Sequence, residues 1–120
     1  MSSYANLPRV AHVSNEFEVV INKGDADGIR KGQVFLLFAE GPEINDPVTG
    51  NSLGALEVIR GRGEVIHLQK RMATVRCSDK TPIYANTSSL SNFRFMAQQP
   101  IRYEDKAFKG IRVGDYARPV

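Results

Sequence analysis

The fold of this chain is decided by residues 19–38, which read Val19-Val20-Ile21-Asn22-Lys23-Gly24-Asp25-Ala26-Asp27-Gly28-Ile29-Arg30-Lys31-Gly32-Gln33-Val34-Phe35-Leu36-Leu37-Phe38. The stretch begins and ends in apolar runs, and the first run is rich in the β-branched residues typical of strands. The segment between them carries Gly24, Gly28 and Gly32. Glycine adopts positive φ without steric cost, as tight turns require. The stretch therefore predicts two strands joined by a turn, with these glycines as structural turn residues.

The length and composition indicate one folded domain. The chain has 120 residues, of which 42% are hydrophobic and 24% charged, the usage of an ordinary globular protein. We expect residues 1–9 to form a flexible N-terminal segment and residues 10–120 a single domain. The single cysteine, Cys77, excludes an intramolecular disulfide.

Hydropathy gives no reason to expect a membrane partner. No apolar run approaches the ~20 residues of a membrane helix, and the N-terminus lacks the apolar region of a secretory signal. The expected location is the cytoplasm, and a virion or a trimmed periplasmic protein is the alternative.

Short β patterns continue outward from the opening stretch. The clearest hairpin joins residues 63–68 to residues 72–77, in which Ala73, Val75 and Cys77 alternate with polar residues. The other predicted strands are 10–13, 17–21, 33–39 (buried on both faces, or a short stretch at the centre of a barrel), 53–59, 93–96 and 116–120. The predicted loops are 40–51, 78–92 and 103–109. No segment has a capped 3.6-residue stripe. The sequence therefore predicts an all-β fold, a small, partly open β-barrel of about six or seven strands with little helix.

Two turn patterns add detail to this barrel. In the loop 40–51, Asp46-Pro47 starts a turn and Gly50 suits its left-handed position. Residues 28–34 are echoed by residues 110–116, since both read Gly-Ile-Arg-x-Gly-polar-apolar. We expect each copy to place a tight turn just before a strand. Gly110 and Gly114 therefore join the structural turn residues, at corners of a barrel closed by its first and last strands.

These turns carry a resemblance to a known family. The opening stretch matches the pattern N-x-G-x-x-D-G-[IV]-x-x-G, residues 46–50 match D-P-x-T-G followed by Leu53-Gly54, and residues 110–115 match a closing Gly-[IV]-x-x-Gly-Asp. Most of residues 10–118 thereby resemble the C-terminal domain of flagellar assembly protein T and related small β-barrel modules of bacterial envelope proteins. The first turn alone resembles the β-domain of the rod-shape protein MreC. The resemblance implies a non-catalytic barrel used in assembly.

The sequence does not match the residue spacing of common catalytic and cofactor-binding motifs. Aligning Gly28 with the glycine of a calcium loop puts Lys23 at the first ligand position and Val34 where a bidentate Glu is needed. Residues 61–66 begin like G-x-G-x-x-G but end in Ile66, and no Walker A pattern occurs. Cys77 belongs to an apolar strand face, and neither His12 nor His67 lies in a catalytic signature. We expect no enzyme activity, no metal and no cofactor.

The charge is distributed unevenly along the chain. Residues 1–57 carry four Lys or Arg against eight Asp or Glu, and residues 58–120 carry twelve against five. Either the two signs mix on the surface once the chain folds into a barrel, or the asymmetry favours head-to-tail self-association or an anionic partner. The leading expectation is a non-catalytic interaction or assembly module that forms a homo-oligomer. The alternative is a small barrel that binds nucleic acid or another polyanion through the basic residues of the central hairpin, Arg60, Arg62, Lys70, Arg71 and Arg76.

Overall fold

The computed structural model describes residues 4–84 and 101–120. Within these residues the chain forms β-strands and one short 3₁₀ turn, η1 (Asp25–Asp27). The strands are β1 (Val10–Asn15), β2 (Glu18–Ile21), β3 (Val34–Asn45), β4 (Ser52–Leu68), β5 (Ala73–Cys77), β6 (Lys80–Ile83), β7 (Arg102–Asp105) and β8 (Tyr116–Pro119). The prediction of an all-β fold with little helix is confirmed. No helix in the described ranges is long and apolar enough to cross a bilayer.

Six strands form one antiparallel sheet in the order β1-β2-β5-β4-β3-β8. The sheet curls until its two outer strands meet at an isolated bridge between Arg9 and Tyr116. Two backbone hydrogen bonds flank the bridge, from Val10 N to Asp115 O at 2.7 Å and from Ala117 N to Pro8 O at 2.9 Å. Because this seam is short, the barrel is partly open, as predicted.

The interior of the barrel is formed by alternate residues along the strands. Ala73, Val75 and Cys77 are buried, whereas Thr74 and Arg76 between them are only half-buried, so the predicted alternation of β5 is confirmed. The largest buried side chains around them are Phe35, Phe38, Ile21, Leu37, Val10, Val19 and Val65. The expectation that residues 33–39 are buried on both faces is wrong in part, because Val34, Leu36 and Ala39 are only half-buried.

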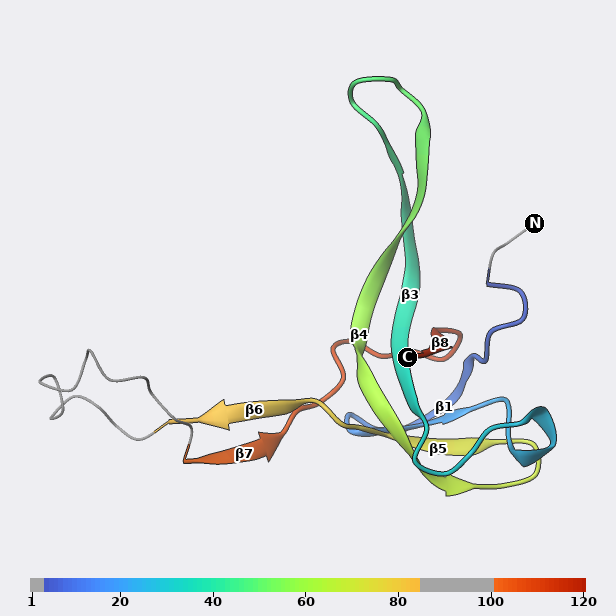
Figure 1. Cartoon of the computed structure of the whole chain (residues 1–120), viewed down its shortest axis with the longest axis vertical. Helices are drawn as coiled ribbons and strands as arrows, with labels where there is room; N and C mark the ends of the chain where they lie inside the picture. Colours follow the sequence, from blue (N-terminus) through green and yellow to red (C-terminus); the bar gives the residue numbers. More distant parts are fainter. Residues whose placement is uncertain (1–3, 85–100) are drawn as a thin grey trace, which may run out of the picture.

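The main departure from the sequence prediction is a long hairpin that rises out of the barrel (Figure 1). Residues 40–51 are not one loop, because β3 continues to Asn45. Residues 53–59 and 63–68 are not two strands either, because β4 runs unbroken from Ser52 to Leu68. Gly54 and Gly61 have positive φ at irregular points in the β3–β4 pairing. These glycines bend the strand through β-bulges instead of ending it.

The opening stretch forms the corner that feeds β3. Gly28 and Gly32 have φ of 85° and 88°, the left-handed conformation expected of turn glycines. Gly24 differs, because its φ is −141°. A Cβ on Gly24 would lie 2.6 Å from the backbone nitrogen of Met72 and would overlap the carbonyl of Gln69. Glycine is required there because η1 docks directly on the β4–β5 turn.

The echoed corner has the same geometry. Gly110 and Gly114 have φ of 67° and 97° just before β8, and β8 pairs with β3. The two corners therefore deliver neighbouring antiparallel strands. Asp115 closes the second corner by accepting hydrogen bonds from Arg60 Nε at 3.2 Å and from Arg112 N at 2.9 Å.

A second, two-stranded sheet pairs β6 with β7. β6 and residues 103–105 of β7 fall in segments predicted as loops, 78–92 and 103–109, because their exposed residues show no hydrophobic alternation. Arg76 ties β7 to the barrel by pairing with Asp105 at 2.8 Å and with Glu18 at 3.0 Å, and Lys80 also pairs with Asp105. The predicted strand 93–96 lies outside the described residues.

Candidate functional site

The surface that stands out is the hairpin formed by residues 39–59, called the arm below. β3 pairs with β8 only over Phe35–Phe38, and β4 pairs with β5 only from Gly63 onward. In the arm, β3 and β4 therefore pair only with each other among the described residues. A two-stranded ribbon is marginally stable on its own. Its outer edges also present unpaired backbone groups that could accept another strand.

One face of the arm is apolar. Val58 lies opposite Ala39 in the strand pairing, and Ile44 lies opposite Gly54. Leu56 is two residues from Val58 and so points to the same face. Leu56 is 51% exposed, although it is a large aliphatic residue. Exposed aliphatic side chains that share one face of a ribbon make that face a candidate interaction surface.

The other face of the arm carries the acidic residues, together with Ile59, which lies opposite Phe38 and is 48% exposed. Glu40 lies directly opposite Glu57 in the strand pairing, an arrangement of like charges that is unfavourable by itself. The arm contains Glu40, Glu43, Asp46 and Glu57 and no Lys or Arg. Of these four carboxylates, only Glu57 forms an ion pair with a described residue. The arm thus carries uncompensated negative charge next to its apolar face.

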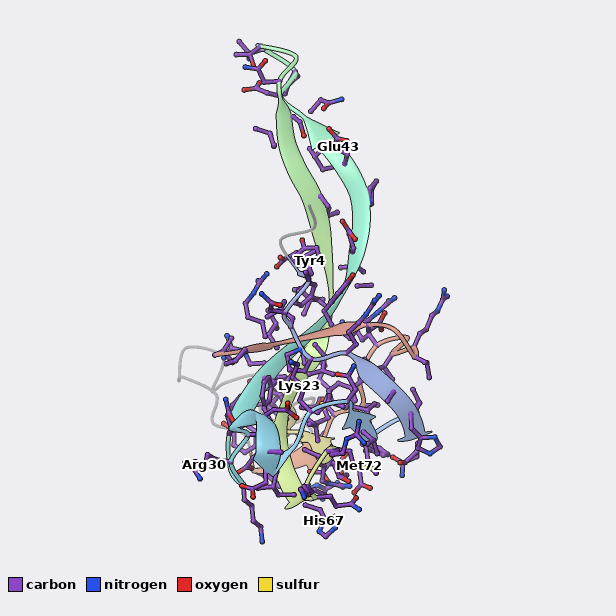
Figure 2. The ribbon with its side chains drawn as sticks, turned by 90° about the vertical axis from the view of Figure 1, so that its right-hand side faces the viewer. Tyr4, Lys23, Arg30, Glu43, His67 and Met72 are labelled. Atoms are coloured by element: carbon purple, nitrogen blue, oxygen red, sulfur yellow. The ribbon has the colours of Figure 1, made fainter. Side chains whose placement is uncertain are left out.

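The root of the arm is braced by three aromatic rings. Tyr4 packs edge-on against Phe38, with 5.3 Å between ring centroids, and lies tilted against Tyr116 at 4.9 Å. Figure 2 shows Tyr4 where the arm leaves the barrel. In the N-terminal segment expected to be flexible, Tyr4 is thus buried. Burial and a hydrogen bond with Glu57 raise the pKa of the Tyr4 phenol. The arm therefore leaves the barrel in a defined direction.

An ion pair completes this brace. Arg118 donates two hydrogen bonds to the Glu57 carboxylate, from Nη1 at 2.7 Å and from Nη2 at 2.6 Å. The same guanidinium lies 4.7 Å above the Phe38 ring, a favourable cation–π arrangement. The paired Arg118 holds the pKa of Glu57 below its ordinary value.

The tip of the arm is an ordered turn. Gly50 N donates to Asp46 O, and Val48 N donates to the Asp46 carboxylate, both at 2.8 Å. Gly50 has φ of 77°, the left-handed conformation expected from the Asp46-Pro47 turn. This turn presents Val48 outward with 90% of its surface exposed.

The basic residues predicted to bind polyanions do not share one environment. Arg60 is engaged by Asp115, and Arg76 is engaged by Glu18 and Asp105. Arg62 is exposed on β4, whereas Lys70 and Arg71 form the exposed β4–β5 turn. Arg62, Lys70 and Arg71 form no ion pair within the described ranges, so only part of the predicted cluster presents free charge.

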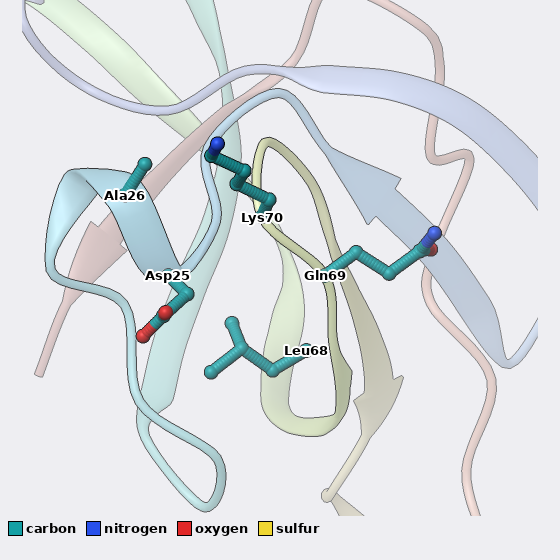
Figure 3. Close-up of a pocket in the computed structure, with 5 residues that line it drawn as sticks. All are labelled: Asp25, Ala26, Leu68, Gln69 and Lys70. Atoms are coloured by element: carbon teal, nitrogen blue, oxygen red, sulfur yellow. The ribbon is translucent and has the colours of Figure 1, made fainter.

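The polar groups around the hollow beside the β4–β5 turn do not converge on one point. The hollow in Figure 3 is lined by Asp25, Ala26, Leu68, Gln69 and Lys70. The Asp25 carboxylate and the Lys70 amine point in different directions there. Over residues 4–84 and 101–120, no three or more His, Cys, Asp and Glu side chains lie where they could hold a metal ion.

The two histidines and the cysteine also stand apart. His12 on β1 and His67 on β4 are exposed on strands separated by β2 and β5. Cys77 is buried, and loss of solvation raises the pKa of its thiol. A raised pKa keeps the sulfur protonated and poorly nucleophilic.

Comparison with protein-family models and with curated proteins finds no match for this chain. The interpretation of the arm therefore depends on its own geometry.

Sequence reasoning missed the arm and its brace. The signal that could have found the arm is the absence of Lys and Arg from residues 32–59, combined with isolated aliphatic residues on both sides of the 46–50 turn. Contacts of Tyr4 and Arg118 with the arm join distant parts of the chain, and no local pattern encodes them.

Proposed function

We propose that this chain is a non-catalytic interaction and assembly module that self-associates through its arm. The observation that supports this proposal best is the exposed apolar face of the arm around Leu56 and Val58, on a ribbon that the barrel does not cover. A lone ribbon of this length gains most of its possible burial only by docking on another surface.

The brace at the root supports the same proposal. Tyr4, Phe38 and Tyr116 hold the arm in one direction, so little conformational freedom is lost when it docks. Preorganisation of this kind strengthens binding by reducing its entropic cost. The acidic residues along the arm act against uncontrolled strand pairing, as charges on exposed edges commonly do.

The test is the oligomeric state of the full chain, measured by sedimentation velocity across concentrations from ~1 µM to ~1 mM, where weak and moderate assemblies dissociate. We expect the average mass of the sedimenting species to rise with protein concentration, and we expect Leu56→Asp to abolish this rise. Val113→Asp is the matched control, because Val113 is also exposed but lies before β8, outside the arm. A strict monomer over the whole range would show that the proposal is wrong.

A second proposal, polyanion binding, is supported by the free charges of Lys70 and Arg71 in one exposed turn. Its test is binding to single-stranded nucleic acid at low and physiological salt. Phosphate contacts are strongest at low salt, so an absence of binding there would end this proposal. If the protein does bind, the double variant Lys70→Gln/Arg71→Gln should have a lower affinity for nucleic acid of any nucleotide sequence.

A further inference from the structure

The molecule has opposite charges at its two ends. The arm holds Glu40, Glu43 and Asp46, which form no ion pair with a described residue. The other end holds four exposed cations, Arg30 and Lys31 before β3 and Lys70 and Arg71 in the β4–β5 turn, called the basic end below. Figure 2 shows Glu43 on the arm and Arg30 and Met72 at the opposite end.

The basic end also carries acidic neighbours. Asp25, Asp27 and Glu64 lie on the adjacent elements. The Asp27 carboxylate already accepts the backbone N–H of Gly24 at 3.0 Å. Four cations against three carboxylates, one of them hydrogen-bonded, leave this end positive.

A shallow hollow of about 540 Å³ adjoins the basic end. Ala11, Val20 and Met72 supply its apolar lining, and the polar lining consists of Arg71, His12, Asn22 and Asp27, whose carboxylate is already engaged by the Gly24 N–H. Met72 is 41% exposed, so an apolar side chain entering the hollow would bury surface that water now covers. Apolar lining next to a cation suits an aliphatic group that is flanked by carboxylates.

The tip of the arm has that chemistry. Val48 is the most exposed large hydrophobic residue described in the chain, and the Asp46 turn holds it in place. Asp46 and Glu43 lie beside it in the sequence. The tip therefore offers an aliphatic side chain together with negative charge.

Pairing of two arms with each other is disfavoured by the same charges. An arm-to-arm contact would bring two sets of uncompensated carboxylates together, and like charges at an interface cost binding energy. Contact of an arm with a basic end pairs opposite charges instead.

We infer that the arm tip of one copy docks into the hollow at the basic end of a second copy, with Val48 against Met72 and the arm carboxylates facing Arg71 and Lys70. This inference rests on the proposed self-association and names its geometry. The two contacting surfaces differ, so the contact is heterologous and each copy keeps one free tip and one free hollow. Such a contact repeats into closed rings or open filaments.

A charge-swap experiment on the full chain tests this geometry. Glu43→Lys should weaken self-association by about tenfold or more, and so should Arg71→Glu, because each places like charges at the contact. An equimolar mixture of the two variants should recover the assembly, since the altered arm of one variant then meets the altered hollow of the other. Glu16→Lys, which makes the same charge change in the β1–β2 turn, should leave assembly unchanged.

Sedimentation velocity gives the readout, and circular dichroism checks that each exposed-site variant is folded. If either single variant assembles like the wild type, or if the mixture fails to recover assembly while Leu56→Asp still blocks it, the head-to-tail geometry is wrong and the assembly proposal survives. If the wild type is monomeric throughout, both are wrong.

Discussion

Arg118 on β8 donates two charge-assisted hydrogen bonds, of 2.7 and 2.6 Å, to Glu57 on β4. This ion pair joins the last strand to the root of the arm. The two residues are far apart in the sequence and lie on opposite sides of β3. Bidentate geometry of this kind fixes orientation as well as adding energy.

This pair should make stability depend on acid pH. Glu57 has a lower pKa when folded than when unfolded, so its contribution is present above the ordinary glutamate pKa of about 4.3 and is lost as pH falls through the lower folded value. Glu57→Gln should lower the melting temperature by a few degrees at neutral pH and by less in acid. Thermal melts across this range measure the difference. Glu16→Gln, at an exposed site with no ion pair to a described residue, is the control, and a Glu57→Gln effect of equal size at both pH extremes would contradict the argument.

Gly32→Val should destabilise the fold by roughly 1–3 kcal/mol. A β-branched residue is forced there into a disfavoured backbone region, because φ is 88°, although the nearest outside atom to a new Cβ is Glu64 Oε1 at 3.9 Å. Urea unfolding measures the loss. Lys31→Val is the matched control, since no non-glycine residue described here has positive φ. Equal stabilities for the two variants would place the strain elsewhere.

Gly63→Ala should also destabilise the fold, but the cause is overpacking of the interior. A Cβ on Gly63 would overlap Val75 Cγ1 and come within 3.1 Å of Phe108 Cζ. Overpacking of this kind costs about 1–3 kcal/mol. In a double-mutant cycle with Val75→Ala, the combined loss should be smaller than the sum of the single losses, because the smaller side chain removes the overlap. Strictly additive losses would mean that the two sites do not touch.

Cys77 should resist a thiol reagent in the folded protein. The sulfur is buried, and its raised pKa keeps it protonated near neutral pH. Mild denaturant should expose the Cys77 thiol and allow it to react. A Ser14→Cys variant supplies an exposed thiol on β1 as an internal reference. If both thiols react at the same rate in native buffer, the interior at β5 is open to solvent.

The elements that could be predicted from the sequence are those whose pattern reflects burial. The alternation of Ala73, Val75 and Cys77 follows directly from one buried face of β5. The echo between Gly28 and Gly110 marks real corners because left-handed backbone has a strong residue preference.

The arm escaped prediction because its strands are not buried. Gly41 and Pro42 read as a loop, although the pairing has a register shift between Glu40 and Glu43 that accommodates them. Pro42 cannot donate a ladder hydrogen bond, and a bulge on an unpaired edge tolerates that. The candidate site was missed for the same reason. Leu56 and Val58 are exposed, whereas strand patterns detect residues that are buried.

The seam between Pro8–Val10 and Asp115–Ala117 has a mechanical consequence. Its hydrogen bonds join Pro8 to Ala117 and Val10 to Asp115, so the segment entering β1 and the end of β8 leave the seam from the same end. Tension applied at Pro8 and Ala117 would load these bonds one after another, as in unzipping, and not all together, as in shear. Traction applied between these two residues would therefore part the seam bond by bond at low force.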